Sequence, residues 1–209
     1  MSNGNMFERL WKLLATANKL VLDGKRDAEA FCNLLQAFIE VKQVKVWKTW
    51  KTIKFDKFGA GPQSTKAFCR AAKPLGIILT NLVNDFLVNR SSSLVMSTHE
   101  TQVDLVVVSV AELDFKNGGT FENIQARAQE LGLDLCPPEV GLHLRLQYTD
   151  QPKDEWLYIA MKPITYSIGR RIYLFGVGNV DSVLYLASSG DDPDYVFDGN
   201  CRFVFLRRK

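Results

Sequence analysis

Residues 103–132, VDLVVVSVAELDFKNGGTFENIQARAQELG, contain a strand pattern followed by a helix pattern. The β-branched run at 103–110 favours a strand, because such side chains pack well on a pleated surface. Thr120 precedes an apolar repeat of helical spacing and Gly132 follows it, which predicts a capped helix over 120–131 with glycine at its C′ position. The stretch therefore predicts an α+β fold.

Further short strands separated by turn residues are expected in the rest of the back half. We expect these strands at 142–148, 156–161, 171–177, 183–187 and 202–206, with a hairpin turn at 179–182. Residues 97–209 are therefore predicted to form a mostly antiparallel β-sheet domain that contains one helix. We expect this domain to fold without the residues that precede it.

The front half is predicted to be helical. Apolar residues at helical spacing over 7–21, ended by Asp23-Gly24, predict a first helix. Asp27 can cap a second helix. Its expected buried stripe consists of Phe31, Leu34, Leu35 and Phe38.

A Lys-rich and aromatic segment follows these helices. Residues 41–58 are expected to be a strand or an extended connector, and a helix capped by Ser64 or Thr65 should run to Ala72. Pro74 breaks that pattern before a further helix at 75–88. The polar stretch at 89–101 gives the expected boundary between an N-terminal helical region, 1–96, and the domain 97–209.

Composition and charge limit the class of protein. The chain has 209 residues, of which 46% are hydrophobic and 23% are charged, as is typical of globular proteins. Residues 1–102 hold 15 Lys and Arg against 8 Asp and Glu, a net charge of +7, whereas the remaining residues carry −4. This asymmetry is expected of two parts with separate roles, or of a front half attracted to an anionic partner.

Cysteine spacing and hydropathy indicate the compartment. The four cysteines are widely spaced and form no zinc pattern, which favours free thiols in a reducing compartment. No stretch approaches the roughly 20 apolar residues needed to span a bilayer. We therefore expect a cytoplasmic location without membrane association.

Three stretches resemble a known group of proteins. They are THETQVDLVVVSVAELDF at 98–115, ARAQELGLDLCPPEVG at 126–141 and RFVFLRRK at 202–209. In these stretches, the sequence is similar to a family of conserved hypothetical bacterial proteins that is known from environmental genomes and has no known activity. The resemblance implies a bacterial origin and transfers no functional residue.

Lysine recurs at every third position from Lys42 to Lys57, among aromatic residues. Phosphates attract lysines and bases stack on aromatic rings, so the segment is a candidate for weak, non-specific binding of single-stranded nucleic acid. The candidate contacts are Lys45, Trp47, Lys48, Trp50 and Lys51. The alternative is a solvated connector whose aromatic rings pack on neighbouring elements.

A thiol, a carboxylate, an imidazole and a guanidinium lie close together in one segment. Cys136, Glu139, His143 and Arg145 are therefore the candidate catalytic residues. The alternation of leucines at 142–146 instead predicts a strand with His143 and Arg145 on its solvent-exposed face. A strand with these side chains facing solvent is the simpler interpretation.

Other chemical signals are weak. His99 has no nearby histidine, and the aspartates at 191–198 do not follow the EF-hand spacing, so no metal site is predicted. We find no phosphate-binding loop and expect no cofactor. The sequence favours a non-enzymatic binding or assembly module with an unidentified protein partner. The alternative is an enzyme of hydrolase or transferase type, with a site around Glu139, His143 and Arg145.

Overall fold

The computed structural model describes residues 3–24, 27–29, 32, 45–55, 62–89, 101–165 and 171–208. The chain forms two units, Met1–Val44 and Lys45–Lys209. This division differs from the boundary expected between residues 96 and 97, because strand β1 (Lys51–Phe55) pairs with strand β3 (Thr101–Ser109). Strands from both sides of the expected boundary therefore belong to one sheet.

Helix α1 (Asn3–Leu22) is the main described element of the first unit. It confirms the helix expected over 7–21, and it ends at Leu22, directly before the turn Asp23-Gly24, where Gly24 has a φ of 66° that glycine adopts without strain. Asp27 accepts a hydrogen bond from the backbone N–H of Glu29 at 2.8 Å, as an N-cap residue does. The stripe expected at 31–38 lies outside the described residues. None of the described helices is long and apolar enough to cross a membrane.

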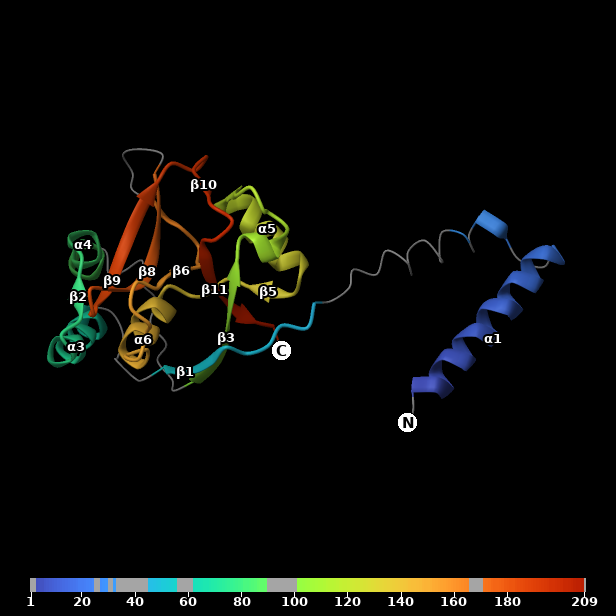
Figure 1. Ribbon diagram of the computed structural model, residues 1–209, viewed down its shortest axis with the longest axis horizontal. Coiled ribbons are helices and arrows are strands. Elements are labelled where there is room, and N and C mark those ends of the chain that lie inside the picture. Colours follow the sequence, from blue (N-terminus) through green and yellow to red (C-terminus); the bar gives the residue numbers. More distant parts are fainter. Residues whose placement is uncertain are drawn as a thin grey trace. The chain divides into compact units, whose positions relative to one another are not determined.

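The second unit is built on a mixed sheet of nine strands, and antiparallel pairs predominate. The strand order is β1-β3-β11-β6-β8-β9-β2 (Figure 1). Strand β5 also pairs with β11, and β7 pairs with β8. The pairs β6–β11 and β2–β9 are parallel. The bounds not yet given are β2 (Ile78–Leu79), β5 (Leu133–Asp134), β6 (Trp156–Ile159), β7 (Ile164–Thr165), β8 (Ile172–Val180), β9 (Val183–Asp191) and β11 (Arg202–Arg207). A separate small sheet pairs β4 (Gly119–Thr120) with β10 (Val196–Phe197).

Four α-helices of the second unit are described. They are α3 (Pro62–Ala72), α4 (Asn81–Asn89), α5 (Phe121–Glu130) and α6 (Glu139–Gln147). Short 3-10 turns occur at Lys73–Leu75 and Ala111–Leu113. Helix α6 contacts β1, β8 and β9, and α4 contacts β9 (Figure 1). The expected single helix of residues 97–209 is thus corrected to two, α5 and α6.

Several local sequence signals are confirmed. Thr120 caps α5 by accepting a hydrogen bond from the backbone N–H of Asn123, and Gly132 follows the helix with a φ of 84°. Strands β8 and β9 form the expected hairpin through Asp181 and Ser182, which have φ values of 50° and 67°. Positive φ at both central residues is the geometry of a type I′ turn.

Two expectations from periodicity are wrong. The helix expected at 75–88 is interrupted, because Gly76 has a φ of 65° and the short strand β2 precedes α4. The strand expected at 142–148 is helix α6. All residues from Glu139 to Arg145 are buried, so the helix has no polar stripe, and the alternating leucines imitate the period of a strand.

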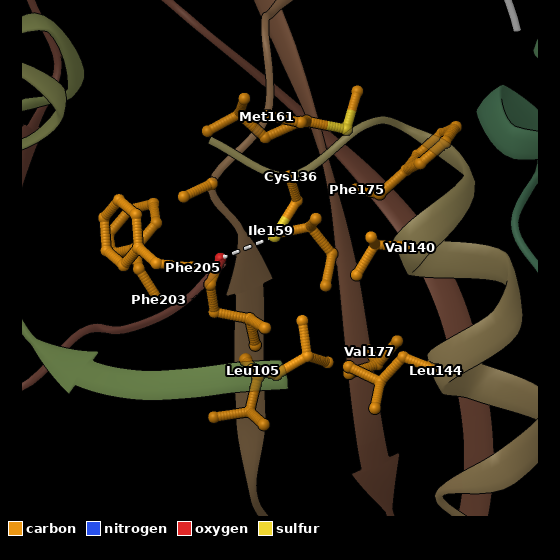
Figure 2. Packing of buried hydrophobic residues seen from close by; sticks show 14 of the residues in the cluster. Leu105, Cys136, Val140, Leu144, Ile159, Met161, Phe175, Val177, Phe203 and Phe205 are labelled. Carbon is orange, nitrogen blue, oxygen red and sulfur yellow. Dashed lines mark hydrogen bonds between the residues drawn. The ribbon is translucent and has the colours of Figure 1, made fainter. Parts of the chain in front are cut away.

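One part of the hydrophobic core lies between α6 and the sheet. Val140 and Leu144 of α6 pack towards Ile159 of β6 and Val177 of β8 (Figure 2). Gly141 lets the helix approach closely, because a Cβ atom there would lie 3.2 Å from the Phe175 side chain. This close packing holds the segment after α6 at a defined place on the sheet.

Candidate functional site

Cys136, a candidate nucleophile, is a core residue. Its thiol is buried, donates a hydrogen bond to the carbonyl oxygen of Val204 at 3.4 Å, and lies beside Ile159 (Figure 2). Burial raises the pKa of the Cys136 thiol. The reactive thiolate is therefore disfavoured, and the thiol behaves as a small apolar side chain.

Glu139, His143 and Arg145 are also buried, which corrects the expectation that His143 and Arg145 face solvent. The His143 ring stacks on Phe55 of β1, with a distance of 4.9 Å between the ring centroids. Glu139 precedes His143 by one helical turn, whereas Arg145 is displaced from His143 by about 200° around the helix axis. Helix α6 therefore does not direct His143 and Arg145 to one point.

Arg145 organises the segment that follows α6. Its guanidinium group is fully buried and donates hydrogen bonds to Gln151 Oε1 at 2.5 Å, to the Gly178 carbonyl oxygen at 3.2 Å and to the Tyr148 carbonyl oxygen. Burial lowers the pKa of Arg145 to about 10. None of these acceptors is a carboxylate, so Arg145 links α6, the following loop and β8 through oxygen dipoles.

The same network continues to Glu155 at the molecular surface. Glu155 accepts a hydrogen bond from Tyr148 Oη at 2.7 Å and forms an ion pair with Arg202 Nη1 at 2.7 Å, so both of its carboxylate oxygens are engaged. The Asn179 side chain donates to the Gln151 carbonyl oxygen at 2.7 Å. These bonds hold the loop before β6 against the start of β11.

An open groove of about 710 Å³ lies where this loop meets β6 and β11. It is the larger of two grooves described in the second unit. Its lining consists of Pro152, Lys153, Asp154, Glu155, Trp156, Tyr158, Asp198, Asn200, Cys201 and Arg202. We call it the β6/β11 groove. Cys201 and Asp198 contribute to it, whereas Cys136, Glu139, His143 and Arg145 do not line it.

Trp156 is the largest side chain of the β6/β11 groove, and two glycines of the neighbouring strand seat its indole ring. A Cβ atom at Gly176 would lie 2.9 Å from the ring, and one at Gly178 would lie closer still. An aromatic ring across from a strand glycine covers the exposed backbone and fixes the ring orientation. The buried Trp156 Nε1 has no hydrogen-bond partner in the described part of the chain, and the ring packs on the two glycines and on Tyr158.

Tyr158 lies two residues along β6, on the same face of the strand as Trp156. Its ring is 6.2 Å from the Trp156 ring, edge to face, and stacks on Phe203 at 5.2 Å. Burial raises the pKa of Tyr158 to about 12. The phenol is therefore neutral at physiological pH, and Trp156 and Tyr158 together form an aromatic wall of the groove.

The charges of the groove leave an excess of carboxylate. Arg202 is paired with Glu155, and Lys153 Nζ lies 3.6 Å from Asp181 Oδ1, outside the groove lining. Asp154 and Asp198 form no ion pair with any residue that the structure describes. The groove therefore carries local negative charge beside an aromatic wall.

The candidate nucleic-acid contacts lie on β1 and the extended residues before it. Trp47 is half-buried and donates through Nε1 to the Leu131 carbonyl oxygen at 2.8 Å, and Lys45 Nζ lies 4.3 Å from the centre of the Trp47 ring. Trp50 packs edge-on against Tyr148 at 5.0 Å. Both indole rings therefore already pack within the protein.

The lysines of this segment differ in environment. Lys45 and Lys48 are exposed, and so is Lys54. Lys51 is partly buried, lies 4.7 Å from the Tyr148 ring centre and pairs with Asp150 at 3.7 Å. The exposed lysines can contact phosphate, whereas Lys51 stabilises the fold through its contact with Tyr148.

No described set of His, Cys, Asp and Glu side chains could hold a metal ion as a group of three. The smaller groove, about 390 Å³, lies between α3 and α4 and is lined by Thr65, Lys66, Cys69, Arg70, Leu87 and Val88. The four cysteines are free.

The chain matches no protein-family model, no curated protein and no solved structure. The fold defines an α+β protein with a mixed sheet, and the candidate site is an open groove lined by aromatic and charged side chains. Sequence reasoning missed this groove. Its one local signal is Gly176-Val177-Gly178 in β8, paired with a strand that begins at Trp156.

Proposed function

We propose that this protein is a non-enzymatic binding module of the bacterial cytoplasm, and that the β6/β11 groove holds a segment of a partner protein. The observation that carries the proposal is the indole ring of Trp156, seated on Gly176 and Gly178 at the wall of an open groove. A ring held by shape loses little conformational freedom when a partner binds.

The composition of the groove supports a protein partner. Trp, Tyr and Arg are the residues that most often dominate the binding energy of protein interfaces. The lining of the β6/β11 groove includes Trp156, Tyr158 and Arg202. Arg202 is held by Glu155, and Glu155 is held by Tyr148, so the polar rim is organised before a partner arrives.

The enzymatic alternative receives less support from the geometry. Cys136, His143 and Arg145 lie in the core, and burial keeps the Cys136 thiol protonated. Arg145 donates to two backbone carbonyl oxygens and to an amide side chain. These are the bonds of a structural residue, and neither described groove gives a substrate access to them.

Selection of displayed random peptides on the immobilised full chain tests the proposal. We expect enrichment of a consensus sequence on the wild type, and loss of that enrichment on Trp156→Ala. The affinity of a consensus peptide, measured by fluorescence polarisation, should fall at least about tenfold, the effect of losing about 1.4 kcal/mol at an interface anchor.

Two further variants keep the test specific. Arg70→Ala changes the groove between α3 and α4 and should leave peptide affinity unchanged. Trp156→Phe retains a ring over the glycines and should keep part of the affinity, with a thermal unfolding transition near that of the wild type. A consensus peptide that binds Trp156→Ala as well as the wild type would contradict the proposal, as would the absence of any enriched consensus.

Weak binding of single-stranded nucleic acid is a second candidate function. One observation favours it: Lys45, Lys48 and Lys54 are exposed along β1 and the residues before it, and β1 is at an edge of the sheet. Such binding would rest on phosphate attraction, because Trp47 and Trp50 already pack within the protein.

A further inference from the structure

We propose that the β6/β11 groove recognises a basic side chain, the ammonium group of lysine or the guanidinium group of arginine, on the partner segment. This inference rests on the proposed function and adds the chemistry of the ligand. The cation would lie over the aromatic wall formed by Trp156 and Tyr158, with Asp154 and Asp198 as its counter-charges.

The charge balance of the lining favours a cation over an anion. Both basic side chains of the groove are engaged, Arg202 with Glu155 at 2.7 Å and Lys153 with Asp181 at 3.6 Å. Asp154 and Asp198 have no such cation among the described residues. A positively charged ligand would therefore gain two carboxylate neighbours without displacing an existing ion pair.

Asp198 is held in place for this role. Its Oδ1 accepts a hydrogen bond from the Asn200 backbone N–H at 2.8 Å, and its carbonyl oxygen accepts one from the Cys201 N–H at 2.9 Å. The intervening Gly199 packs closely, because a Cβ atom there would lie 2.7 Å from the Lys116 carbonyl oxygen. These bonds and this packing fix the loop, so the Asp198 carboxylate is presented to a ligand in a defined orientation.

The backbone also fixes the position of Asp154. This residue has a φ of 63°, and its N–H donates to the Asn179 carbonyl oxygen at 2.7 Å. Asn179 in turn is bonded to Gln151, which Arg145 holds. The buried arginine network of α6 therefore positions one of the two carboxylates at the groove.

The aromatic wall complements these carboxylates. Indole is the best of the aromatic rings for attracting a cation, and the attraction is stronger where water is partly excluded. One face of the Trp156 ring rests on Gly176 and Gly178, and the residue lines the groove. The alkyl stem of lysine or arginine could pack on the ring while its charge reaches a carboxylate.

Titration of the isotope-labelled full chain with small capped amino acids, followed by NMR, tests the inference. The probes are N-acetyl-lysine amide, N-acetyl-arginine amide, the uncharged N-acetyl-norleucine amide and the acidic N-acetyl-glutamate amide. We expect the lysine and arginine probes to shift the Trp156 indole signal and the amide signals of Asp154 and Asp198. The norleucine probe should bind at least about fivefold more weakly, and added salt should narrow this difference.

A matched pair of variants separates the effect of the groove carboxylate from the effect of negative charge elsewhere on the surface. Asp198→Asn keeps the Oδ1 acceptor of the turn and removes the charge, so affinity for the lysine probe should fall about threefold to fivefold while the norleucine response is unchanged. Asp192→Asn makes the same change at an exposed loop residue outside the groove lining. It should leave the lysine probe unaffected.

The outcomes distinguish this inference from the proposed function. Equal binding of norleucine and lysine, preference for the glutamate probe, or an equal effect of the two variants would overturn the basic-ligand inference. If peptide selection still enriches a consensus without a basic residue, the groove binds a partner of other chemistry, and only this inference fails. If no consensus is enriched, the proposed function fails as well.

Discussion

At the scale of single residues, Trp156 and the glycine beneath it should depend on each other. Gly178→Ala places a methyl group within the volume of the indole ring, and overpacking of this kind lowers the free energy of unfolding by about 1–3 kcal/mol. In a Trp156→Ala background the same change should cost much less. Urea denaturation of the two single variants and the double variant measures this coupling.

Gly76→Ala is the control for this comparison of single and double variants. Gly76 has a φ of 65° and no atom within 4 Å of an added Cβ, so its cost of about 1 kcal/mol comes from backbone strain alone. That cost should be the same with and without Trp156. Additive effects of Gly178→Ala and Trp156→Ala would show that the indole is not seated on the glycine.

Arg145 allows a second prediction at this scale. Arg145→Lys keeps a cation but loses the planar group that reaches Gln151, Gly178 and Tyr148 together. We expect the free energy of unfolding to fall by about 2–4 kcal/mol, because buried acceptors are left without donors. Arg208→Lys, at an exposed ion pair with Asp134, should cost under about 1 kcal/mol. Equal losses in the two variants would refute a structural role for Arg145.

At the scale of secondary-structure elements, α6 protects the edge strand β1. Gln147 donates to the Lys54 carbonyl oxygen at 2.7 Å and accepts from the Lys54 N–H at 3.0 Å, as a neighbouring strand would. Gln147→Leu should therefore speed hydrogen exchange of the Lys54 amide about twofold to tenfold. NMR-detected exchange measures this rate. Gln129→Leu, at an exposed position of α5, should leave the exchange rate of the Lys54 amide unchanged. An unchanged rate in both variants would show that Gln147 does not protect β1.

The segment before β1 gives a further prediction at this scale. If the protein binds single-stranded nucleic acid, replacing the exposed Lys45, Lys48 and Lys54 by glutamine should flatten the slope of log affinity against log salt concentration by roughly 0.7 for each phosphate that is no longer neutralised. Trp47→Ala should lower stability instead, because Trp47 is bonded to Leu131. Titration of labelled oligonucleotides at several salt concentrations measures both variants. Binding that depends on Trp47 at unchanged stability would indicate base stacking.

At the scale of the whole molecule, the second unit should fold by itself, whereas its back part should not. Residues 45–209 contain both edges of the sheet, β1 and β2. A chain of residues 97–209 lacks these strands and the buried side chains Phe68 and Phe86, so the expectation that it folds alone is reversed. The free-energy cost of losing several buried aromatic and aliphatic side chains exceeds the free energy of unfolding of a typical domain.

Thermal unfolding of the two truncated chains measures this difference. We expect a cooperative transition for residues 45–209 close to that of the full chain, and none for residues 97–209. A cooperative transition of the shorter chain would mean that β3, β6, β8, β9 and β11 with α5 and α6 form a complete core.

The sequence by itself determined those elements whose signals are local. Strand β3, the capped helix α5 and the β8–β9 hairpin were predictable, because a cap residue, a positive φ or a β-branched run acts on neighbouring residues. The α+β class follows from their order along the chain. The expected strands of the back half were recovered except at 142–148.

Only the tertiary structure decided the rest. Burial around the whole of α6 removed the polar stripe by which a helix is recognised, and this also hid the burial of His143 and Arg145. The β6/β11 groove joins the loop before β6 to the residues before β11, and its indole is seated on β8. These segments meet because parallel pairing of β6 with β11, and antiparallel pairing of β6 with β8, brings them together. Such long-range pairing leaves no signal within a short stretch of sequence.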